Sequence, residues 1–293
     1  MHTYIDQNFL INCANNSAML AKARAASATP AISFVLSPWH FYELGSIEPI
    51  RANELLEIIE KLKPKYILDR ADLQLAEFKQ AWCKYWKMPL TPFVPIADLA
   101  DIAGVLIRET PEKLARFTLG DYVNVFRQFG QLNLDPVLKD QQAIAAANQA
   151  SVKAGKMTAD VIRKIEVAYI AQQLARLAET GPSHEEQAER MRAILSDSAK
   201  VQSIRTFIDG NGMVELRAWK VESVLTDHHH TGTAKLGENR QVDRQHAVEA
   251  LAYCDRLVTD DKELLKLCAV VAAQCPFRVA EAQSAETFLN FLH

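Results

Sequence analysis

The sequence lacks the features that mark membrane and secreted proteins. It has no run of about 18 consecutive apolar residues, the length that a membrane-spanning helix needs. The first residues, Met1 to Asp6, contain neither a basic segment nor an apolar stretch, so we expect no secretory signal peptide. The chain is therefore expected to work without a membrane.

Cysteine is scarce, and it is not arranged in pairs. The chain has five cysteines, an odd number, and no CxxC motif. This pattern favours free thiols over a disulfide framework and is typical of a reducing compartment. We therefore expect a cytoplasmic protein.

A surplus of basic residues is also missing. The 33 lysines and arginines are outnumbered by 36 aspartates and glutamates, which gives a formal net charge of -3. A protein that coats nucleic acid without sequence preference would usually be basic, so the charge argues against that class. It leaves open an enzyme that binds nucleic acid through metal ions and a local basic patch.

Three familiar arrangements of functional residues are absent as well. We find no Ser-His-Asp or Cys-His arrangement that calls for a side-chain nucleophile. Gly210-Asn211-Gly212 has no Lys-Ser/Thr partner, so it predicts a turn and not a phosphate loop. His228, His229 and His230 cannot all reach one zinc ion without strain, and we expect a loop over residues 227–233.

Both ends of the chain alternate between strand and helix patterns. At the N-terminal end we expect strands over residues 2–5 and 31–36, separated by a helix over 9–26 and followed by a helix that begins at Ser37-Pro38. At the C-terminal end we expect helices over 241–253, 262–273 and 285–292, with strands over 256–259 and 276–280 between them. This alternation predicts βαβ units and a parallel sheet.

The middle of the chain is dominated by helix-forming residues. The predicted helices cover residues 53–62, 71–86, 112–129, 158–178 and 185–195. We therefore expect an α/β fold with a small parallel sheet, formed by residues 1–50 and 236–293. Residues 51–235 are expected to form a long, mainly helical insertion or cap.

Acidic residues follow the predicted strands. Asp6 ends the first strand, Glu43 lies in the helix after the second, and Asp243 opens the helix before the third. Asp260 and Asp261 end that third strand. Since ligands bind beyond the carboxyl ends of the strands in an open α/β sheet, three of these positions should converge on one edge, and Glu43 can reach it from its helix.

Several carboxylates in one pocket repel each other, and a hard divalent cation removes that conflict. Oxygen ligands favour Mg²⁺ or Mn²⁺ over zinc. A carboxylate-bound Mg²⁺ that keeps several waters is suited to phosphodiester hydrolysis. The acids therefore indicate a metal-dependent nuclease.

Four motifs in order resemble those of the PIN-domain nucleases. They are Tyr4-Ile5-Asp6-x-Asn8, Ser37 to Glu43-Leu44, Asp243-x-x-His246-Ala247 and Val258-Thr259-x-Asp261. The resemblance covers about a third of the chain. It departs from a minimal PIN domain in the 200 residues that separate Glu43 from Asp243 (243 − 43 = 200).

The resemblance implies a Rossmann-like sheet with a Mg²⁺ or Mn²⁺ site. Asp6, Glu43, Asp243 and Asp261 would be the metal-binding and catalytic quartet. Asn8 and Thr259 would be supporting polar residues.

Structural alternatives exist for each of these acids. Asp6 could only cap the following helix, and Asp243 could be an acid favoured in a first helical turn. Glu43 could be an exposed helical residue. Asp260 could replace Asp261 in the site, although the Thr-x-Asp spacing favours Asp261 and leaves Asp260 as a solvated neighbour.

Three further features have both a functional and a structural interpretation. His246 lies three residues after Asp243, on the same helical face, and could support the site or be a core histidine. Lys22 and Arg24 could contact phosphates. The basic and aromatic residues from Lys79 to Lys87 could bind a single strand, but a helix that packs its aromatic residues inward fits the pattern better.

We therefore expect a nuclease that cuts RNA more readily than DNA. The alternatives are a nuclease for structured DNA and a non-catalytic binding module that uses the helical region to contact a protein. A toxin with a cognate inhibitor, and a homodimer, are suggested only by the resemblance.

Overall fold

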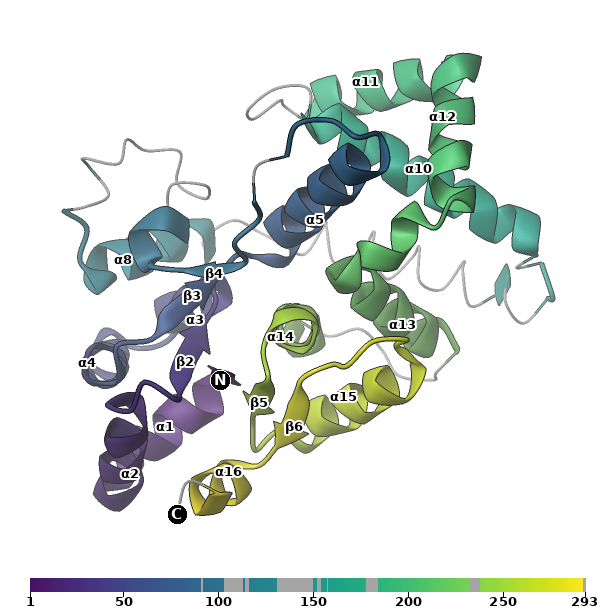
Figure 1. Ribbon diagram of the computed structural model, residues 1–293. Helices are drawn as coiled ribbons and strands as arrows, with labels where there is room; N and C mark the ends of the chain where they lie inside the picture. The colour runs from purple at the N-terminus through teal and green to yellow at the C-terminus, as the bar shows by residue number, and fades with distance from the viewer. Residues whose placement is uncertain are drawn as a thin grey trace.

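The computed structural model describes residues 1–90, 92–102, 113, 116–130, 150–151, 154–156, 158–177, 184–231 and 238–291. Its centre is a six-stranded sheet in the order β4-β3-β2-β1-β5-β6, flanked by helices (Figure 1). The strands are β1 (His2–Ile5), β2 (Ser33–Leu36), β3 (Lys65–Ile67), β4 (Ile96–Ala97), β5 (Arg256–Val258) and β6 (Glu281–Gln283). All neighbouring strands run parallel except β3 and β4.

The first strand occupies the position that matters for a ligand. β1 pairs with β2 on one side, through Thr3 opposite Phe34, and with β5 on the other, through Tyr4 opposite Leu257. The chain builds the sheet outward from β1 to β3 and later returns to the opposite side of β1. Such a switch in strand order opens a crevice at the carboxyl ends of the strands, which here lies between β1 and β5.

Helices cover both faces of the sheet (Figure 1). The first face carries α1 (Gln7–Asn15), α2 (Ser17–Ser27), α4 (Pro49–Leu62) and α16 (Ala285–Phe291). The second face carries α13 (Arg217–Thr231), α14 (Glu238–Tyr253) and α15 (Lys262–Gln274). The rings of Phe9, Phe34 and Phe288 meet on the first face, with centroids 5.8–6.5 Å apart.

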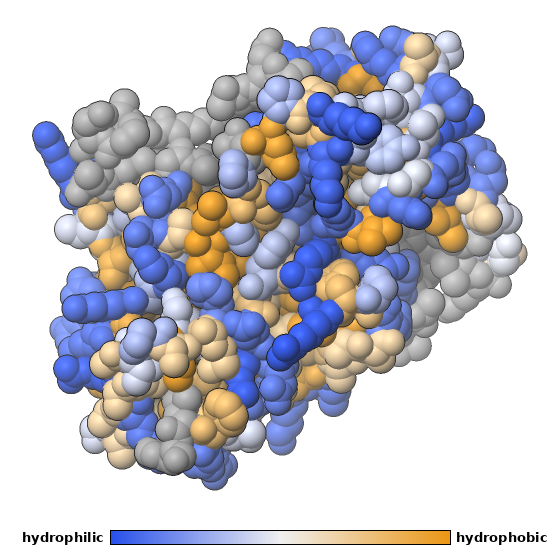
Figure 2. All heavy atoms as spheres, viewed as in Figure 1, coloured by the Kyte–Doolittle hydropathy of each residue, from blue (hydrophilic) through white to orange (hydrophobic). Residues whose placement is uncertain are grey.

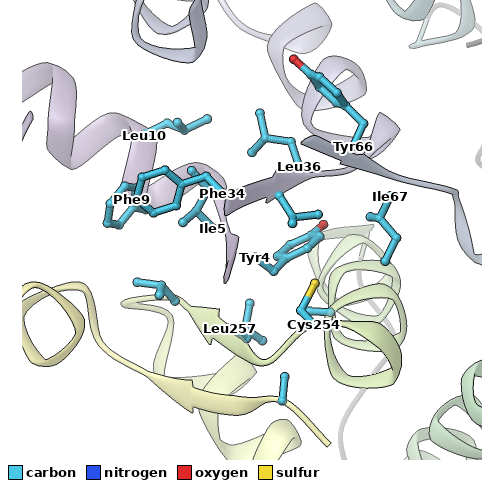
Figure 3. Close-up of a cluster of buried hydrophobic side chains, with 14 of the residues drawn as sticks. Tyr4, Ile5, Phe9, Leu10, Phe34, Leu36, Tyr66, Ile67, Cys254 and Leu257 are labelled. Carbon is cyan, nitrogen blue, oxygen red and sulfur yellow. The ribbon is translucent and has the colours of Figure 1, made fainter. Parts of the chain in front are cut away.

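The buried side chains of β1 alternate between these two faces, as the strand period requires. Ile5 lies toward Phe9 and Phe34, whereas Tyr4 lies toward Cys254 at the end of α14 (Figure 3). Both residues are fully buried. The phenol of Tyr4 therefore brings a polar atom into the second face of the core.

A second, smaller core lies away from the sheet. It is formed by α5 (Arg70–Tyr85), α10 (Ala159–Leu177), α11 (His184–Ser196), α12 (Ser198–Asp209) and the 3₁₀ helix η1 (Gly212–Glu215). Trp82 and Tyr85 pack against Phe207 in this core, at ring distances of 5.1 and 5.3 Å. The inward-packing interpretation of the segment from Lys79 to Lys87 is therefore confirmed for these two aromatic residues.

The α/β fold is confirmed, but the sheet is mixed and larger than expected. β3 and β4 lie within residues 51–235, for which we predicted helices, and α4 packs against the sheet. The expected boundary at residue 50 therefore falls inside the sheet unit. The other expected boundary, at 235–236, lies outside the described residues, as do residues 112, 114–115 and 178 of the predicted helices.

Three local predictions are wrong. The single helix predicted over residues 9–26 is two helices, α1 and α2, which meet at Asn16. The last strand is β6 at Glu281–Gln283 and not residues 276–280, because Glu281 and Ala282 pair with Arg256 and Leu257. Residues 227–231 continue helix α13 instead of forming a loop. Residues 232 and 233 of that predicted loop lie outside the described residues, whereas Gly210 to Gly212 do form a turn, with Asn211 at φ 63°.

Within the described ranges, no helix combines the length and the apolar character that crossing a membrane would require. On the face drawn in Figure 2, coloured apolar residues lie in separate small areas among hydrophilic ones. All five cysteines are free thiols, as the sequence predicted.

Candidate active site

Asp6 and Thr259 connect the carboxyl ends of β1 and β5. Asp6 is only 4% exposed, and its Oδ1 accepts the backbone N–H of Phe9 at 2.9 Å, so it caps α1. Its Oδ2 accepts the hydroxyl of Thr259 at 2.5 Å and the amide of Asn8 at 3.3 Å. Asp6 thus does cap α1, and its second carboxylate oxygen is bound by Thr259 and Asn8.

Asp261 and Asp260 have different surroundings. Asp261 caps α15 through Oδ1 alone, which accepts the N–H groups of Glu263 and Leu264 at 2.7 and 2.9 Å. Its own N–H donates to Thr259 Oγ1 at 3.0 Å, which ties it to Asp6 through one hydroxyl. Asp261 therefore lies at the same corner of the sheet as Asp6.

Both oxygens of Asp260 are engaged elsewhere. Oδ1 accepts the N–H of Ala285 at 3.0 Å, and Oδ2 accepts the amide of Asn12 at 2.8 Å. Asp260 thereby joins the end of β5 to α16 and α1. This structural role agrees with the preference for Asp261 in the site.

Glu43 reaches the site from α3 (Pro38–Ser46) and contacts His246 on α14. The two side chains meet through Glu43 Oε2 and His246 Nε2, 3.3 Å apart. Burial alone would lower the pKa of His246, but the charges of Glu43, Glu249 and Asp6 raise it to about 9. Burial would raise the pKa of Glu43, yet His246 outweighs burial and holds that pKa below its usual value. The exposed-residue alternative for Glu43 is wrong.

Asp243 lies in the second turn of α14, because the helix begins at Glu238 and not at residue 241. Burial is the main cause that raises its pKa to about 6, followed by the charge of Asp261, with Glu43 and Asp6 adding to it. The pKa of Asp6 is also raised to about 6, mainly by burial, although Thr259 and Phe9 lower it. Asp243 therefore lies close enough to Asp6, Glu43 and Asp261 for their charges to raise its pKa.

The donor set fits a hard cation in its chemistry. All four groups are carboxylates. The pKa values of Asp6 and Asp243 are raised mainly by burial and further by neighbouring carboxylates, and a divalent cation would stabilise the charged form of both. Among the described residues, no three His, Cys, Asp or Glu side chains stand together as a ready metal-binding group. A bound ion would therefore have to draw at least some of the four carboxylates closer together.

An open pocket of about 480 Å³ lies beside Asp261, between α1 and the start of α15. Its lining residues are Asn8, Asn12, Asp260, Asp261, Lys262 and Glu263. Lys262 is exposed and is the basic residue of this lining. The sequence argument did not select Lys262, although its position directly after Asp261 could have suggested it.

The structure does not bring Lys22 and Arg24 to the acids. Both are exposed on α2, which ends at Ser27, six residues before β2 begins. The second half of α2 must therefore lie toward the amino ends of the strands, opposite the acidic edge. Their predicted phosphate contact has no geometric support.

Sequence reasoning also missed the buried polar contacts that Tyr4, Ser37 and Glu249 make beside His246. Tyr4 Oη lies 2.5 Å from His246 Nδ1, 2.8 Å from Ser37 Oγ and 3.2 Å from Glu249 Oε2. The spacing Asp243, His246, Glu249 places three polar residues on one face of α14, which was the available signal.

Comparison of the chain with protein-family models, with curated proteins and with solved structures gave no match.

Proposed function

We propose that this protein is a Mg²⁺- or Mn²⁺-dependent nuclease that hydrolyses phosphodiester bonds, with RNA as the preferred substrate. One observation carries the proposal. Asp6 and Asp243, each with a pKa raised to about 6, share the carboxyl edge of β1 and β5 with Glu43 and Asp261. Carboxylates held in this way favour a divalent cation, and the resemblance to PIN-domain nucleases names the same four residues.

A bound Mg²⁺ or Mn²⁺ would activate water and stabilise charge on the phosphate and the leaving oxygen. Polar residues around Asp6 hold its carboxylate in place for this chemistry. Thr259 and Asn8 fix one oxygen of Asp6, and the N–H of Asp261 completes the link through Thr259. Asp6, Asp243, Asp261 and Glu43 would hold the cation, so no side-chain nucleophile is needed.

Cleavage of labelled RNA and DNA oligonucleotides of matched sequence tests the proposal directly. We expect the wild-type chain to cut RNA with Mn²⁺ or Mg²⁺ and to stop in EDTA, and the double variant Asp6→Asn/Asp243→Asn to be inactive. Cutting of DNA alone would show a structure-specific DNA nuclease. No cutting, together with no rise in melting temperature on adding Mn²⁺, would reject the metal site.

Lys262 is expected to bind a substrate phosphate next to the acids. Lys262 lines the open pocket beside Asp261, whereas Lys22 lies on α2 toward the other edge. We expect Lys262→Ala to weaken oligonucleotide binding about fivefold to tenfold and to reduce its dependence on salt, as the loss of one phosphate contact does. Fluorescence anisotropy with Ca²⁺ in place of Mg²⁺ measures it, with Lys22→Ala as the matched control. Equal losses in both variants would contradict this placement of the substrate.

A non-catalytic binding module is the second candidate, and the ion pair of Glu43 with His246 favours it. This pair neutralises one of the four carboxylates without any metal. The binding module predicts oligonucleotide or protein binding that Asp6→Asn leaves unchanged and that EDTA does not affect. A nuclease predicts that both treatments abolish cleavage.

A further inference from the structure

His246 is held on both sides of its ring. It is 3% exposed, its Nε2 contacts Glu43 Oε2 at 3.3 Å, and its Nδ1 lies 2.5 Å from the hydroxyl of Tyr4. The ring also meets those of Tyr4 and His40 edge-on, with centroids 5.7 and 4.9 Å away. The imidazole is therefore fixed in both position and rotation.

The hydroxyl that anchors His246 is itself part of a fixed network. Tyr4 is fully buried in β1, and its Oη also contacts Ser37 at the start of α3 and Glu249 on α14. Glu249 in turn accepts the backbone N–H of Arg70 at 3.2 Å. Four elements, β1, α3, α5 and α14, thus determine where His246 Nε2 points.

Glu43 is the group that benefits from this arrangement. Its side chain has several rotatable bonds and starts from the second turn of α3, so an unsupported carboxylate would sample several positions. The contact with His246 engages one oxygen, Oε2, and leaves Oε1 for another partner. Buried partners of this kind commonly orient the residues that bind a metal.

We propose that His246, anchored by Tyr4, is a positioning residue that fixes the carboxylate of Glu43 for the divalent cation. This inference rests on the proposed metal-dependent function. It assigns Tyr4 and His246 to the site, although neither touches the substrate. It also gives a function to the buried contact between the Tyr4 hydroxyl and the His246 imidazole.

Calorimetric titration of the full chain with Mn²⁺ tests this assignment. Tyr4→Phe removes the anchoring hydroxyl and leaves the charge of the site unchanged, so it is the main variant. We expect it to weaken Mn²⁺ binding about tenfold, and His246→Leu to weaken it at least as much, in the range known for buried partners of metal ligands. His246→Gln keeps a donor for Glu43 and should recover part of the loss.

Tyr253→Phe is the matched control, because Tyr253 also donates its hydroxyl to a buried carboxylate, that of Glu77. A role limited to folding would lower the melting temperature in both tyrosine variants and leave the Mn²⁺ dissociation constant unchanged in both. Unchanged or tighter Mn²⁺ binding by Tyr4→Phe would overturn the proposal while the metal-dependent function stands. A wild-type chain that binds no Mn²⁺ would overturn the proposed function first, and this assignment with it.

Discussion

Asp243→Asn is expected to reduce metal-dependent cleavage strongly and, without metal, to make the folded chain more stable at pH 7.5. The loss of activity follows because one of four carboxylates for the cation is removed, and we expect kcat/KM to fall by about 10²–10³-fold. The gain in stability follows because the folded chain disfavours the charged form of the same carboxylate. Burial and the charge of Asp261 raise its pKa to about 6 in the folded chain.

The sign of the pH dependence follows from this pKa. In the unfolded chain an aspartate has a pKa of about 3.9. A carboxyl that binds its proton more tightly in the folded state loses its contribution to stability as the pH rises from about 4 to about 6. Asparagine does not titrate, so the variant avoids this loss. A pKa difference of this size is worth about 3 kcal/mol for a buried group, but Asp243 is partly exposed and solvent reduces the effect to about 1 kcal/mol.

Urea unfolding at pH 5.0 and 7.5, in EDTA and in Mn²⁺, measures both effects. We expect Asp243→Asn to exceed the wild type in EDTA at pH 7.5, to approach it at pH 5.0, and to fall below it when Mn²⁺ is added. Glu286→Gln, at an exposed position on α16, changes the net charge equally and is the control. Equal stability of Asp243→Asn and the wild type in EDTA at both pH values would show that the carboxylate is not under electrostatic strain.

Short sequence patterns predicted β1 and β5 and the aspartates that follow them. An aspartate after a short apolar strand is a favoured helix cap, and Asp6 and Asp261 both cap the helices that follow their strands. The same positions are the carboxyl ends of β1 and β5. Capping and the acidic cluster therefore depend on the same two residues, which is why the sequence indicated both.

The rest of the sheet depends on contacts that the sequence does not show. β3 has only three residues, too few for a periodic pattern, and its pairing with β2 is decided by distant neighbours. The run from Pro276 to Ala280 is more apolar than β6, yet the ring of Phe277 lies under the guanidinium of Arg217, 4.7 Å away. Phe277 in the apolar run therefore packs against α13, and Glu281–Gln283 form the edge strand beside β5 instead.

The contacts of Glu43 with His246, and of His246 with Tyr4, could not be predicted from the sequence for the same reason. Tyr4 and His246 are 242 residues apart, and Glu43 and His246 are 203 residues apart. The sequence could place Asp243 and His246 on one helical face, but it could not show which side chains that face would meet. The contact partners became visible only when β1, α3 and α14 were placed together.

Glu77→Ala is expected to lower the free energy of unfolding by about 3 kcal/mol, the largest loss that we expect from one polar residue. Glu77 lies on α5 and is 3% exposed. Its two oxygens accept the N–H of Ala218 at 2.8 and 3.0 Å, and one of them also accepts the hydroxyl of Tyr253. Alanine would leave a first-turn N–H of α13 and a partly buried phenol without their acceptor, and would open a cavity between α5, α13 and α14.

Glu77→Gln separates the hydrogen bonds from the charge. Burial raises the pKa of Glu77 to about 7, although Tyr253 and Ala218 lower it, so its contribution to stability is lost as the pH rises from about 4.5 to about 7. Glutamine keeps one acceptor and does not titrate. We therefore expect Glu77→Gln to lower the free energy of unfolding by about 1 kcal/mol at pH 5, and to leave it unchanged or slightly raised at pH 8.

Urea unfolding at both pH values measures this difference. Glu57→Ala, at an exposed position on α4, is the control and should change the free energy of unfolding by less than about 0.5 kcal/mol. A loss by Glu77→Gln that grows with pH would show instead that the carboxylate is charged and stabilises the start of α13, the helix that packs against α14 and its site residues.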